Sequence, residues 1–252
     1  MSDVYRLDGS LSLVTGASKG IGAATAKALA RQGSDVLLIA RNMKEMEEIV
    51  TEIKAMGRYA KAYQIDLSDP SQVEKFLISE SAAIKNLNHF ISNAAFTVHK
   101  RFTQSSLQEF DDLLSVNVRN MLPLMQSAAE IMKARGSGTI TFITSVNAIN
   151  PLPSQAVYSS TKAMLEALMK SAASELAPYG VRVNSVVPGV IKTPMNSHVT
   201  PEQWEATANR LLSRRVGVPE EVADVVAFIC SDAARYMYGS SVLVDGGLLL
   251  RG

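Results

Sequence analysis

Two side chains that can pass a proton between them lie four residues apart, Tyr158 and Lys162, in the stretch Tyr-Ser-Ser-Thr-Lys. Residues at that spacing share one face of a helix. A phenol has an ordinary pKa of about 10, and a fixed ammonium nearby favours the phenolate and lowers that pKa toward a useful range. Ser145 lies upstream, at the end of the apolar, β-branched run 139–144. These residues predict a proton-transfer site.

A glycine-rich turn near the N-terminus indicates what the proton transfer serves. Gly16, Gly20 and Gly22 stand between an apolar run that ends at Val14 and an alanine-rich helical pattern that continues almost to Gly33. At a strand-to-helix turn, glycines let the backbone approach a pyrophosphate, and the free N–H groups and dipole of the helix start attract it. The strand before and the helix after separate this turn from an ordinary glycine turn. We therefore predict a dinucleotide-binding site.

The end of the second predicted strand bears on which dinucleotide binds. NAD-binding chains place an acidic residue about 20 residues past the glycine turn, whereas NADP-binding chains use a nearby arginine for the ribose 2′-phosphate. Here the acid is absent and Arg41 follows the strand, while Lys19 adds a positive charge inside the glycine turn. The alternative is that both are solvated surface charges, but both fall where a 2′-phosphate would be met. The predicted cofactor is NADPH or NADP+.

Short apolar, β-branched runs alternate with longer helical patterns along the chain. The predicted strands are residues 10–15, 35–40, 62–66, 88–93, 138–144, 181–187 and 241–245. The predicted helices are residues 21–32, 43–56, 70–85, 107–134, 155–177 and 219–230. This alternation predicts an α/β fold, with a doubly wound sheet of seven mainly parallel strands and helices on both faces. Ligands then bind at the carboxyl ends of the strands.

The sequence predicts one domain over residues 1–252, because α/β folds commonly reach this length as a single unit and no linker, repeat or low-complexity tract interrupts the chain. The one irregular insertion, about 190–216, follows the sixth predicted strand and carries Met195 and Trp204. A segment of that length beyond a strand end indicates a small substrate lid.

Composition and charge exclude several classes of partner. Apolar residues make up 47% of the chain and the net charge is +1, so we predict a globular core, no nucleic-acid partner and no membrane partner. The single cysteine, Cys230, excludes an internal disulfide, and the start of the chain lacks a signal-peptide pattern, which together indicate a cytoplasmic location. His89, His99 and His198 lack metal-ligand spacing. We predict no metal and assign the histidines no role.

Taken together, the glycine turn, the Tyr158-x3-Lys162 pair and Ser145 resemble the short-chain dehydrogenase/reductase family over essentially the whole chain. The family's further motifs follow in the same order, as Asp66 after the third strand, Asn93-Ala94-Ala95 after the fourth, Asn117 in the fourth long helix, Pro188-Gly189 after the sixth strand, and Thr193 beyond it. The resemblance implies a Rossmann-type fold.

The resemblance also implies catalytic roles. Tyr158 would be the proton donor or acceptor, and Lys162 would lower its pKa and hold the nicotinamide ribose. Ser145 would hydrogen-bond the substrate oxygen, and Asn117 would anchor a water that links the lysine to solvent. The chemistry agrees, because hydride delivered to a carbonyl carbon creates an alkoxide that needs hydrogen-bond donors and a proton source.

The cofactor contacts implied by the resemblance are spread over several strand ends. Asp66 would contact the adenine, Asn93 would stand beside the adenosine ribose, and Val190 with Thr193 would lie near the carboxamide. The full predicted set is Gly16, Ser18, Lys19, Gly20, Ile21, Gly22, Arg41, Asp66, Leu67, Asn93, Tyr158, Lys162, Pro188, Gly189, Val190 and Thr193. Ala95 departs from the family's usual glycine, and an alanine is tolerated there if its φ is negative, as we expect.

The predicted substrate pocket lies between the loop after Ser145 and the lid. Its predicted residues are Ser145, Asn147, Leu152, Gln155, Tyr158, Met195 and Trp204. This mostly apolar lining fits a neutral ketone or its alcohol, so the chain is predicted to be an NADPH-dependent oxidoreductase acting on CH-OH or C=O groups. A 3-oxoacyl-carrier-protein reductase is one alternative, weakened by Tyr179 where those enzymes tend to have a basic residue. A catalytically silent cofactor-binding scaffold or redox sensor is an alternative of another class.

The long helical patterns 107–134 and 155–177 carry more apolar surface than one sheet face needs. In the resembled family, the corresponding helices pair with their copies in a second subunit. A symmetric homo-oligomer, a dimer or a tetramer, is therefore expected.

Overall fold

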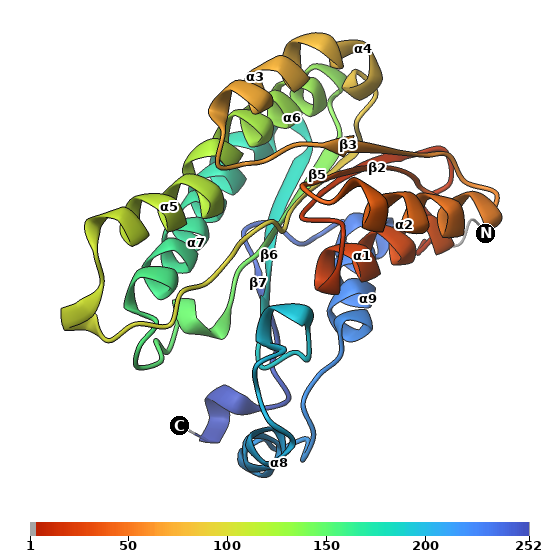
Figure 1. Cartoon of the computed structure of the whole chain (residues 1–252). Coiled ribbons are helices and arrows are strands. Elements are labelled where there is room, and N and C mark those ends of the chain that lie inside the picture. The colour runs from red at the N-terminus through yellow and green to blue at the C-terminus, as the bar shows by residue number, and fades with distance from the viewer. Residues whose placement is uncertain (1–3, 252) are drawn as a thin grey trace.

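A seven-stranded sheet forms the centre of the molecule in the computed structural model, which describes residues 4–251 (Figure 1). The strands are β1 Leu11–Thr15, β2 Asp35–Ala40, β3 Ala60–Gln64, β4 His89–Ser92, β5 Gly138–Ile143, β6 Val181–Pro188 and β7 Ser241–Val244. Their order is β3-β2-β1-β4-β5-β6-β7, and every neighbouring pair is parallel. The predicted doubly wound sheet is confirmed, with the change of direction between β1 and β4. The outermost residues of the predicted domain, 1–3 and 252, lie outside the described residues.

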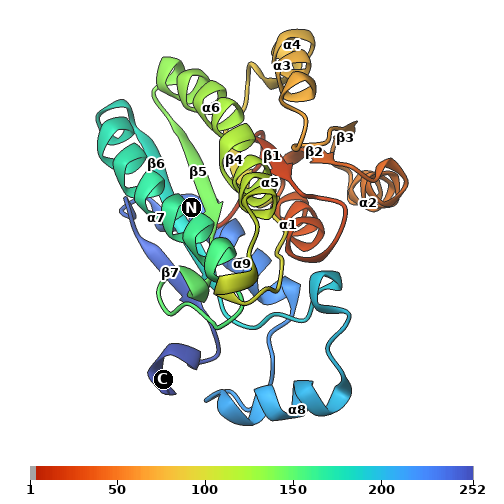
Figure 2. The same ribbon diagram turned by 60° about the vertical axis from the view of Figure 1, so that its left-hand side comes forward.

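Helices cover both faces of this sheet (Figures 1 and 2). The α-helices are α1 Gly20–Arg31, α2 Met43–Ala55, α3 Pro70–Ser79, α4 Ser81–Ile84, α5 Leu107–Asn117, α6 Leu122–Arg135, α7 Ala156–Leu176, α8 Pro201–Arg210 and α9 Pro219–Cys230. One apolar core lies between the sheet and α1, α2 and α9, and the other between the sheet and α3 to α7. Side chains alternate between the two cores along a strand, so Leu38 of β2 enters the first and Leu37 the second.

The helix predicted over 107–134 is in fact two helices. α5 ends at Asn117, because the next residue, Val118, has a φ of −135°. A short 3-10 turn follows, and α6 begins at Leu122 with Pro123 in its first turn. Proline fits there because the N–H groups of a first turn have no partner within the helix, whereas inside a continuous helix it removes a hydrogen bond and clashes with the preceding turn.

Two other predicted boundaries were wrong. β3 covers Ala60–Gln64 rather than 62–66, because an edge strand buries only some of its residues and the exposed Lys61 hides its start. The helix predicted over 70–85 breaks at Glu80, whose carboxylate accepts hydrogen bonds from Lys61 Nζ at 3.1 Å and Tyr63 Oη at 2.9 Å. The break places the side chain of Glu80 against the edge strand.

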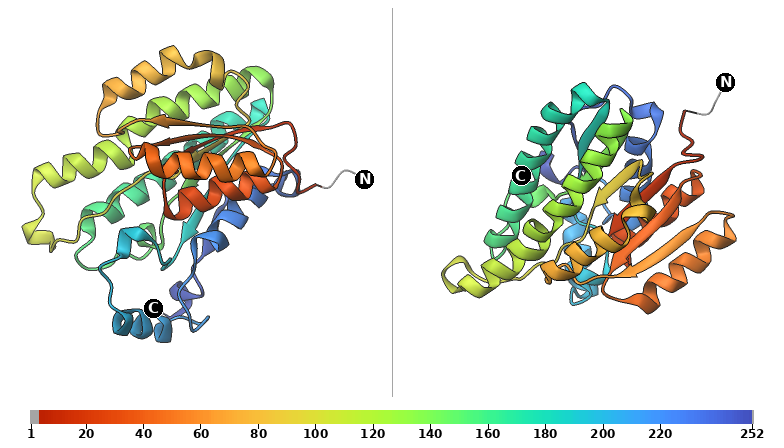
Figure 3. Two further views of the ribbon diagram at one scale, coloured as in Figure 1. Left: turned by 45° about the vertical axis from the view of Figure 1, so that its right-hand side comes forward. Right: turned by 90° about the horizontal axis from the view of Figure 1, so that it is seen from above.

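The predicted lid contains a helix of its own. α8 begins with a capping box in which the Thr200 side chain accepts from the Gln203 N–H and the Gln203 side chain accepts from the Thr200 N–H. In Figures 2 and 3, α8 stands apart from the layers of the sheet, at the end of the molecule where the short turn Leu248–Arg251 also lies. This is the end toward which the strands point with their carboxyl ends.

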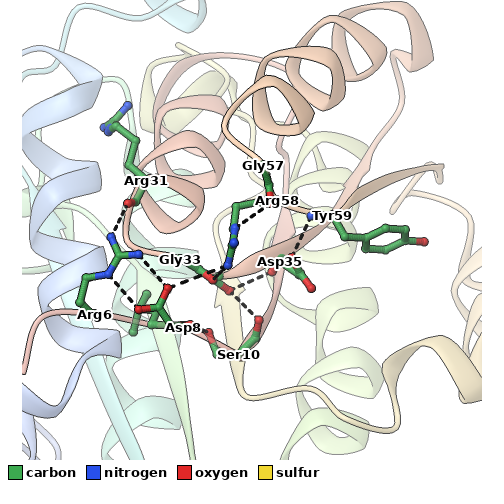
Figure 4. A network of polar contacts seen from close by, with 11 residues as sticks. Arg6, Asp8, Ser10, Arg31, Gly33, Asp35, Gly57, Arg58 and Tyr59 are labelled. Carbon is green, nitrogen blue, oxygen red and sulfur yellow. Dashed lines mark hydrogen bonds and ion pairs between the residues drawn. The ribbon is translucent and has the colours of Figure 1, made fainter. Parts of the chain in front are cut away.

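The opposite end of the sheet is occupied by a network of structural contacts (Figure 4). Arg6 donates to the Asp8 carboxylate at 2.7 and 3.0 Å and to the Arg31 carbonyl at 3.0 Å. Arg58 Nη1 donates to the Gly33 carbonyl at 3.0 Å. Gly33 has a φ of +107°, and a Cβ there would stand 2.1 Å from Asp8 Oδ1, so this turn requires glycine. The network joins the N-terminal segment to the turns before β2 and β3.

Two predictions, the homo-oligomer and the cytoplasmic location, are not tested by the fold. Exposed apolar side chains lie on α5, α6 and α7, among them Leu107, Phe110, Leu122 and Met164. The predicted homo-oligomer stays a prediction, as does the cytoplasmic location. Within residues 4–251, no helix is long and apolar enough to cross a membrane.

Candidate active site

A cleft of about 1380 Å³ opens at the carboxyl ends of the strands. Residues from the loops after β1, β2, β3, β4, β5 and β6 line it, together with residues of the lid. This is the edge at which open α/β sheets bind ligands. The sheet thus brings almost the whole predicted site together, because every predicted site residue except Asn117 lines this one cleft.

The three predicted proton-transfer residues meet on one wall of the cleft. Ser145 follows β5 in an extended conformation, while Tyr158 and Lys162 lie in the first two turns of α7. Lys162 is buried, and its Nζ donates to the Ile143 carbonyl at 2.9 Å. The same Nζ lies 5.7 Å from the centroid of the Tyr158 ring. The Tyr158 hydroxyl is hydrogen-bonded to the Ser145 side chain.

Burial dominates the acid-base properties of this wall. Burial raises the pKa of Tyr158 to about 12, and the hydrogen bond with Ser145 opposes only part of that rise. This rise in the pKa of Tyr158 is opposite to the lowering expected from Lys162. The reason is that the ammonium donates to the Ile143 carbonyl and not to the phenol. Burial also lowers the pKa of Lys162 to about 8. At neutral pH the phenol is therefore protonated, and the lysine is mostly so.

The glycine turn after β1 brings backbone segments into close contact. Gly16 has a φ of +64°, and a Cβ there would stand 2.8 Å from the Ala94 Cα, while one on Gly22 would stand 2.2 Å from the Gly16 carbonyl oxygen. Asn93 Nδ2 donates to the Thr15 carbonyl at 2.8 Å and so holds the turn against the end of β4. Only glycines permit this packing.

The start of α1 fits the pyrophosphate of a dinucleotide. Lys19 is the N-cap residue and makes no side-chain hydrogen bond to the first turn, which begins at Gly20. The first N–H groups of a helix have no partner within the helix, and together with the helix dipole they bind anions. The absence of a side-chain cap leaves these donors to a ligand.

The adenosine end of the cleft carries the two predicted phosphate-binding cations. Lys19 and Arg41 are both exposed and line the cleft, and neither forms an ion pair with an acid among residues 4–251. Gln64 Nε2 donates to the Arg41 carbonyl at 3.0 Å, which holds the backbone there. The Asp66 carboxylate accepts from the Ser68 N–H at 2.9 Å and its hydroxyl at 2.8 Å. The local charge suits a phosphate.

Asn117 lies behind the cleft wall. Its side chain donates to the Phe96 carbonyl and to Thr161 Oγ1, both at 3.1 Å, and accepts from the Phe96 N–H at 3.0 Å. The amide therefore ties the loop after β4 to α7, which carries the proton-transfer pair. Its expected role in holding a water stays a prediction.

The departure at Ala95 leaves the backbone unstrained. Among the described residues other than glycine, positive φ values occur only at Ser154 and Arg214. Ala95 therefore lies outside the left-handed region, as expected, and its methyl group lines the cleft.

The substrate end of the cleft is more polar than predicted. The predicted residues there, Asn147, Leu152, Gln155, Met195 and Trp204, all line it. His99 and His198 also line it, with ring centroids 5.6 Å apart in an edge-to-face arrangement. No role was predicted for these histidines, because they lie far apart along the chain and only the fold brings their loops together. The one available signal was their position after β4 and β6, whose carboxyl ends face the same edge.

Glu166 is a second residue that the sequence analysis missed. It follows Lys162 by one helical turn on α7, and its carboxylate accepts from Thr144 Oγ1 at 2.5 Å, Ser185 Oγ at 3.1 Å and Ser241 Oγ at 2.7 Å. These hydroxyls belong to the end of β5, to β6 and to β7. The carboxylate thus fastens α7 to three strands beside the proton-transfer wall.

Known proteins resemble this chain over nearly its full length. Residues 16–249 match the family model described as Enoyl-(Acyl carrier protein) reductase. A tropinone reductase homolog from Arabidopsis thaliana is 35% identical over 98% of this chain and 95% of its own length. The 3-oxoacyl-[acyl-carrier-protein] reductase of Staphylococcus aureus is 35% identical over 95% of this chain and 98% of its own.

Solved structures show the same architecture. One, provisionally assigned as an NAD(P)-dependent gluconate 5-dehydrogenase of Beutenbergia cavernae and containing NADP, matches with a TM-score of 0.94 and 30% identity, over 98% of this chain and 100% of that one. A 3-oxoacyl (acyl-carrier-protein) reductase of Agrobacterium tumefaciens, also with NADP bound, matches with a TM-score of 0.91 and 30% identity, over 97% of this chain and 96% of that one.

Removing the Glu166 carboxylate is expected to loosen α7 from the sheet. We expect Glu166→Ala to lower the free energy of unfolding by about 1–3 kcal/mol, because three hydroxyl donors lose their acceptor. Urea denaturation measures the change. Glu175→Ala is the matched control, since Glu175 is exposed on the same helix and, among residues 4–251, accepts a side-chain hydrogen bond only from Ser171 one turn away. Equal losses for the two variants would show that Glu166 does not fasten the helix.

Proposed function

The chain belongs to the short-chain dehydrogenase/reductase family of oxidoreductases, and on that premise we propose that it reduces a ketone to a secondary alcohol, or catalyses the reverse, with NADPH as the hydride donor. The observation that carries the proposal is the cluster of Ser145, Tyr158 and Lys162 in the same cleft as the glycine turn. A proton source, an oxygen-binding hydroxyl and a dinucleotide site together suit carbonyl reduction.

The proposed cofactor contacts follow the length of the cleft. The N–H groups at the start of α1 would bind the pyrophosphate, Asp66 the adenine, Asn93 the adenosine ribose and Lys162 the nicotinamide ribose. The other proposed contacts come from Ser18, Ile21, Leu67, Pro188, Gly189, Val190 and Thr193, which line the same cleft. Bound NADPH supplies the hydride for the carbonyl carbon.

Ser145 would stabilise, and Tyr158 would neutralise, the negative charge that hydride transfer leaves on the substrate oxygen. The Ser145 hydroxyl donates a hydrogen bond to that oxygen, which lowers the energy of the developing alkoxide. Tyr158 transfers its phenolic proton, so that the O–H bond of the alcohol forms and a phenolate remains. The raised pKa of Tyr158 keeps the proton in place until the substrate oxygen becomes strongly basic.

Lys162 supplies the charge that stabilises the remaining phenolate. Its Nζ is held by the Ile143 carbonyl at 2.9 Å and lies 5.7 Å from the Tyr158 ring, close enough for a favourable electrostatic interaction in a buried site. The alternative of a silent scaffold would need a damaged catalytic set, whereas all three residues line the cleft.

A 3-oxoacyl-carrier-protein reductase is the second candidate. It is favoured by the likeness to the proteins of that activity from Staphylococcus aureus and Agrobacterium tumefaciens, the latter with NADP bound. Tyr179 in place of a basic residue weakens it. General acid–base chemistry is common to both candidates, so only a comparison of substrates separates them. If the enzyme reduces a 3-oxoacyl carrier-protein thioester at least ~10-fold more efficiently than free ketones, this candidate is favoured.

Loss of the phenol should remove turnover without removing the cofactor. We expect Tyr158→Phe to lower kcat by about 10²–10⁴-fold, because the variant has no proton to donate, and to leave NADPH affinity almost unchanged. Cofactor oxidation with a reducible ketone gives kcat, and fluorescence titration gives the affinity. Tyr236→Phe serves as the control, because that tyrosine is exposed and outside the cleft. Full activity in Tyr158→Phe would disprove the mechanism.

Ketone reduction should weaken at alkaline pH. The lowered pKa of Lys162, about 8, means that its ammonium is present below that pH and is lost above it. Without the ammonium the phenolate product of proton transfer is less stable, so we expect kcat/KM to fall by about tenfold per pH unit above pH 8. The pH profile of kcat/KM is the measurement, with NADPH affinity followed over the same range. A profile that stays flat to pH 10 would contradict the role of Lys162.

Cofactor preference should depend on the charge at the end of β2. We expect Arg41→Ala to raise KM for NADPH by about 10–100-fold while changing KM for NADH little, because a charge-assisted hydrogen bond contributes about 1.5–3 kcal/mol. Arg119→Ala is the matched control, since Arg119 is exposed and does not line the cleft. A wild-type enzyme that uses NADH at least as efficiently as NADPH would overturn the preference.

A further inference from the structure

A chain of polar side chains crosses the substrate end of the cleft. Asn147 Nδ2 donates to Gln155 Oε1 at 2.5 Å, and Gln155 Nε2 lies 3.2 Å from His99 Nδ1. The His99 ring packs edge to face on His198 at 5.6 Å between centroids. All four line the cleft that also contains Tyr158.

The chain is assembled from three separate parts of the sequence, namely the connection between β5 and α7, the loop after β4 and the lid. Asn147 lies in the 3-10 turn after β5, Gln155 precedes α7, His99 lies in the loop after β4, and His198 lies in the lid just before α8. Nothing in local structure requires polar residues at all four positions. Their convergence on one wall of the cleft points to a ligand that they recognise together.

The hydrogen bonds along this chain can all run in one direction. With Asn147 as donor, the Gln155 amide presents its oxygen to Asn147 and its nitrogen to His99. An amide nitrogen only donates, so the facing His99 nitrogen accepts, and the other ring nitrogen carries the proton. Gln155 Nε2 lies 3.2 Å from His99 Nδ1 and 3.5 Å from Nε2, so in the tautomer in which Nδ1 accepts, His99 keeps an Nε2–H donor for a ligand.

An all-hydrocarbon substrate would fit this wall poorly. Its entry would displace water from amide and imidazole groups and offer them no hydrogen bond in return, which is unfavourable. A site built to hydrogen-bond a substrate group rejects analogues that lack it far more strongly than an apolar pocket rejects a change of size. The polar wall therefore favours a substrate with a polar group at this end.

A hydroxyl matches the wall better than a carboxylate does. Amides and neutral imidazoles offer both donors and acceptors, and a hydroxyl does the same, whereas a carboxylate only accepts. The amides of Asn147 and Gln155 carry no charge to pair with a carboxylate, whereas Arg210 of α8 also lines the cleft, so a carboxylate-bearing ketone is the competing probe in the test below. Leu152, Met195 and Trp204 line the same cleft and add apolar surface to it.

We propose that the substrate is a hydroxylated ketone, whose hydroxyl group lies close to the carbonyl and is bound by Gln155 and His99. The inference rests on the proposed carbonyl reduction and adds the class of substrate. Tyr158 and Ser145 act on the carbonyl oxygen, while the polar chain binds the neighbouring hydroxyl. Because His198 belongs to the lid, the lid forms part of the same recognition surface.

Three small ketones of one shape test the proposal. 1-Hydroxybutan-2-one, pentan-3-one and 2-oxobutanoate share an ethyl ketone and carry a hydroxymethyl, an ethyl or a carboxylate group on the other side. The hydroxyl also makes the carbonyl intrinsically more reactive, so a preference of the wild-type enzyme alone decides nothing. The informative quantity is the ratio of kcat/KM for the hydroxyketone to that for pentan-3-one, compared between wild type and variants.

We expect Gln155→Leu and His99→Leu each to reduce this ratio by about 10-fold or more, mainly through the hydroxyketone. The double variant should lose less than the product of the two single losses, because the residues act as one hydrogen-bonded unit. Gln126→Leu is the matched control, since Gln126 is exposed on α6 and outside the cleft. His99 is exposed, so its replacement leaves the core intact.

The outcomes separate the two levels of the proposal. Pentan-3-one reduction that continues in both variants, with the hydroxyketone preference lost, supports the hydroxyl subsite. An unchanged ratio in both variants overturns the subsite while the proposed reductase activity stands. A preference for 2-oxobutanoate that these variants abolish also overturns it, in favour of a keto acid. If the wild-type enzyme oxidises neither NADPH nor NADH with any of the three ketones, the proposed reduction itself fails on these substrates.

Discussion

A buried ammonium is the interaction on which the geometry of the candidate active site depends. Lys162 is only 3% exposed, and its Nζ donates to the Ile143 carbonyl at 2.9 Å. An ammonium taken out of water costs several kcal/mol, so this position is tolerable only while a strong acceptor stays within reach. Ile143 ends β5 two residues before Ser145, and Lys162 follows Tyr158 by one helical turn. The same contact therefore sets the position of the hydroxyl relative to the phenol.

The parallel sheet places the dinucleotide site beside this wall. β1 and β4 are neighbours at the point where the strand order changes direction, and adjacent strands lie about 4.8 Å apart. Asn93 after β4 bonds to the Thr15 carbonyl at the end of β1, and the glycines of the next turn admit the close backbone approach that results. β5 with Ser145 is the next strand along. The strand order therefore places the dinucleotide site at β1 close to the proposed proton donor beside β5.

The sequence predicted what depends on local patterns and missed what depends on distant contacts. Every predicted strand is present, because buried parallel strands read as apolar runs. The predicted site residues other than Asn117 line one cleft, because most of them follow the carboxyl ends of the strands. The break after Asn117 had a local signal in Pro123 that the helical pattern concealed. The burial of Tyr158 had no local signal in the sequence, so the predicted lowering of its pKa was wrong. His99 and His198 meet only because the fold brings the loop after β4 and the lid to the same cleft.

In the candidate site, packed helices and strands hold the proposed proton-transfer residues, whereas loops and the lid line the substrate end. Tyr158 and Lys162 lie on α7, and the Glu166 carboxylate fastens that helix to three strands, so the proton-transfer geometry is held by packed elements. Loops and lids determine which substrates reach such a centre. Gln155 stands at the junction, because it precedes α7 and its amide bonds to His99 in a loop that contacts the lid. A substrate group bound at Gln155, as proposed, would therefore contact a residue that is joined both to the helix of the phenol and, through His99, to the loop that packs against the lid.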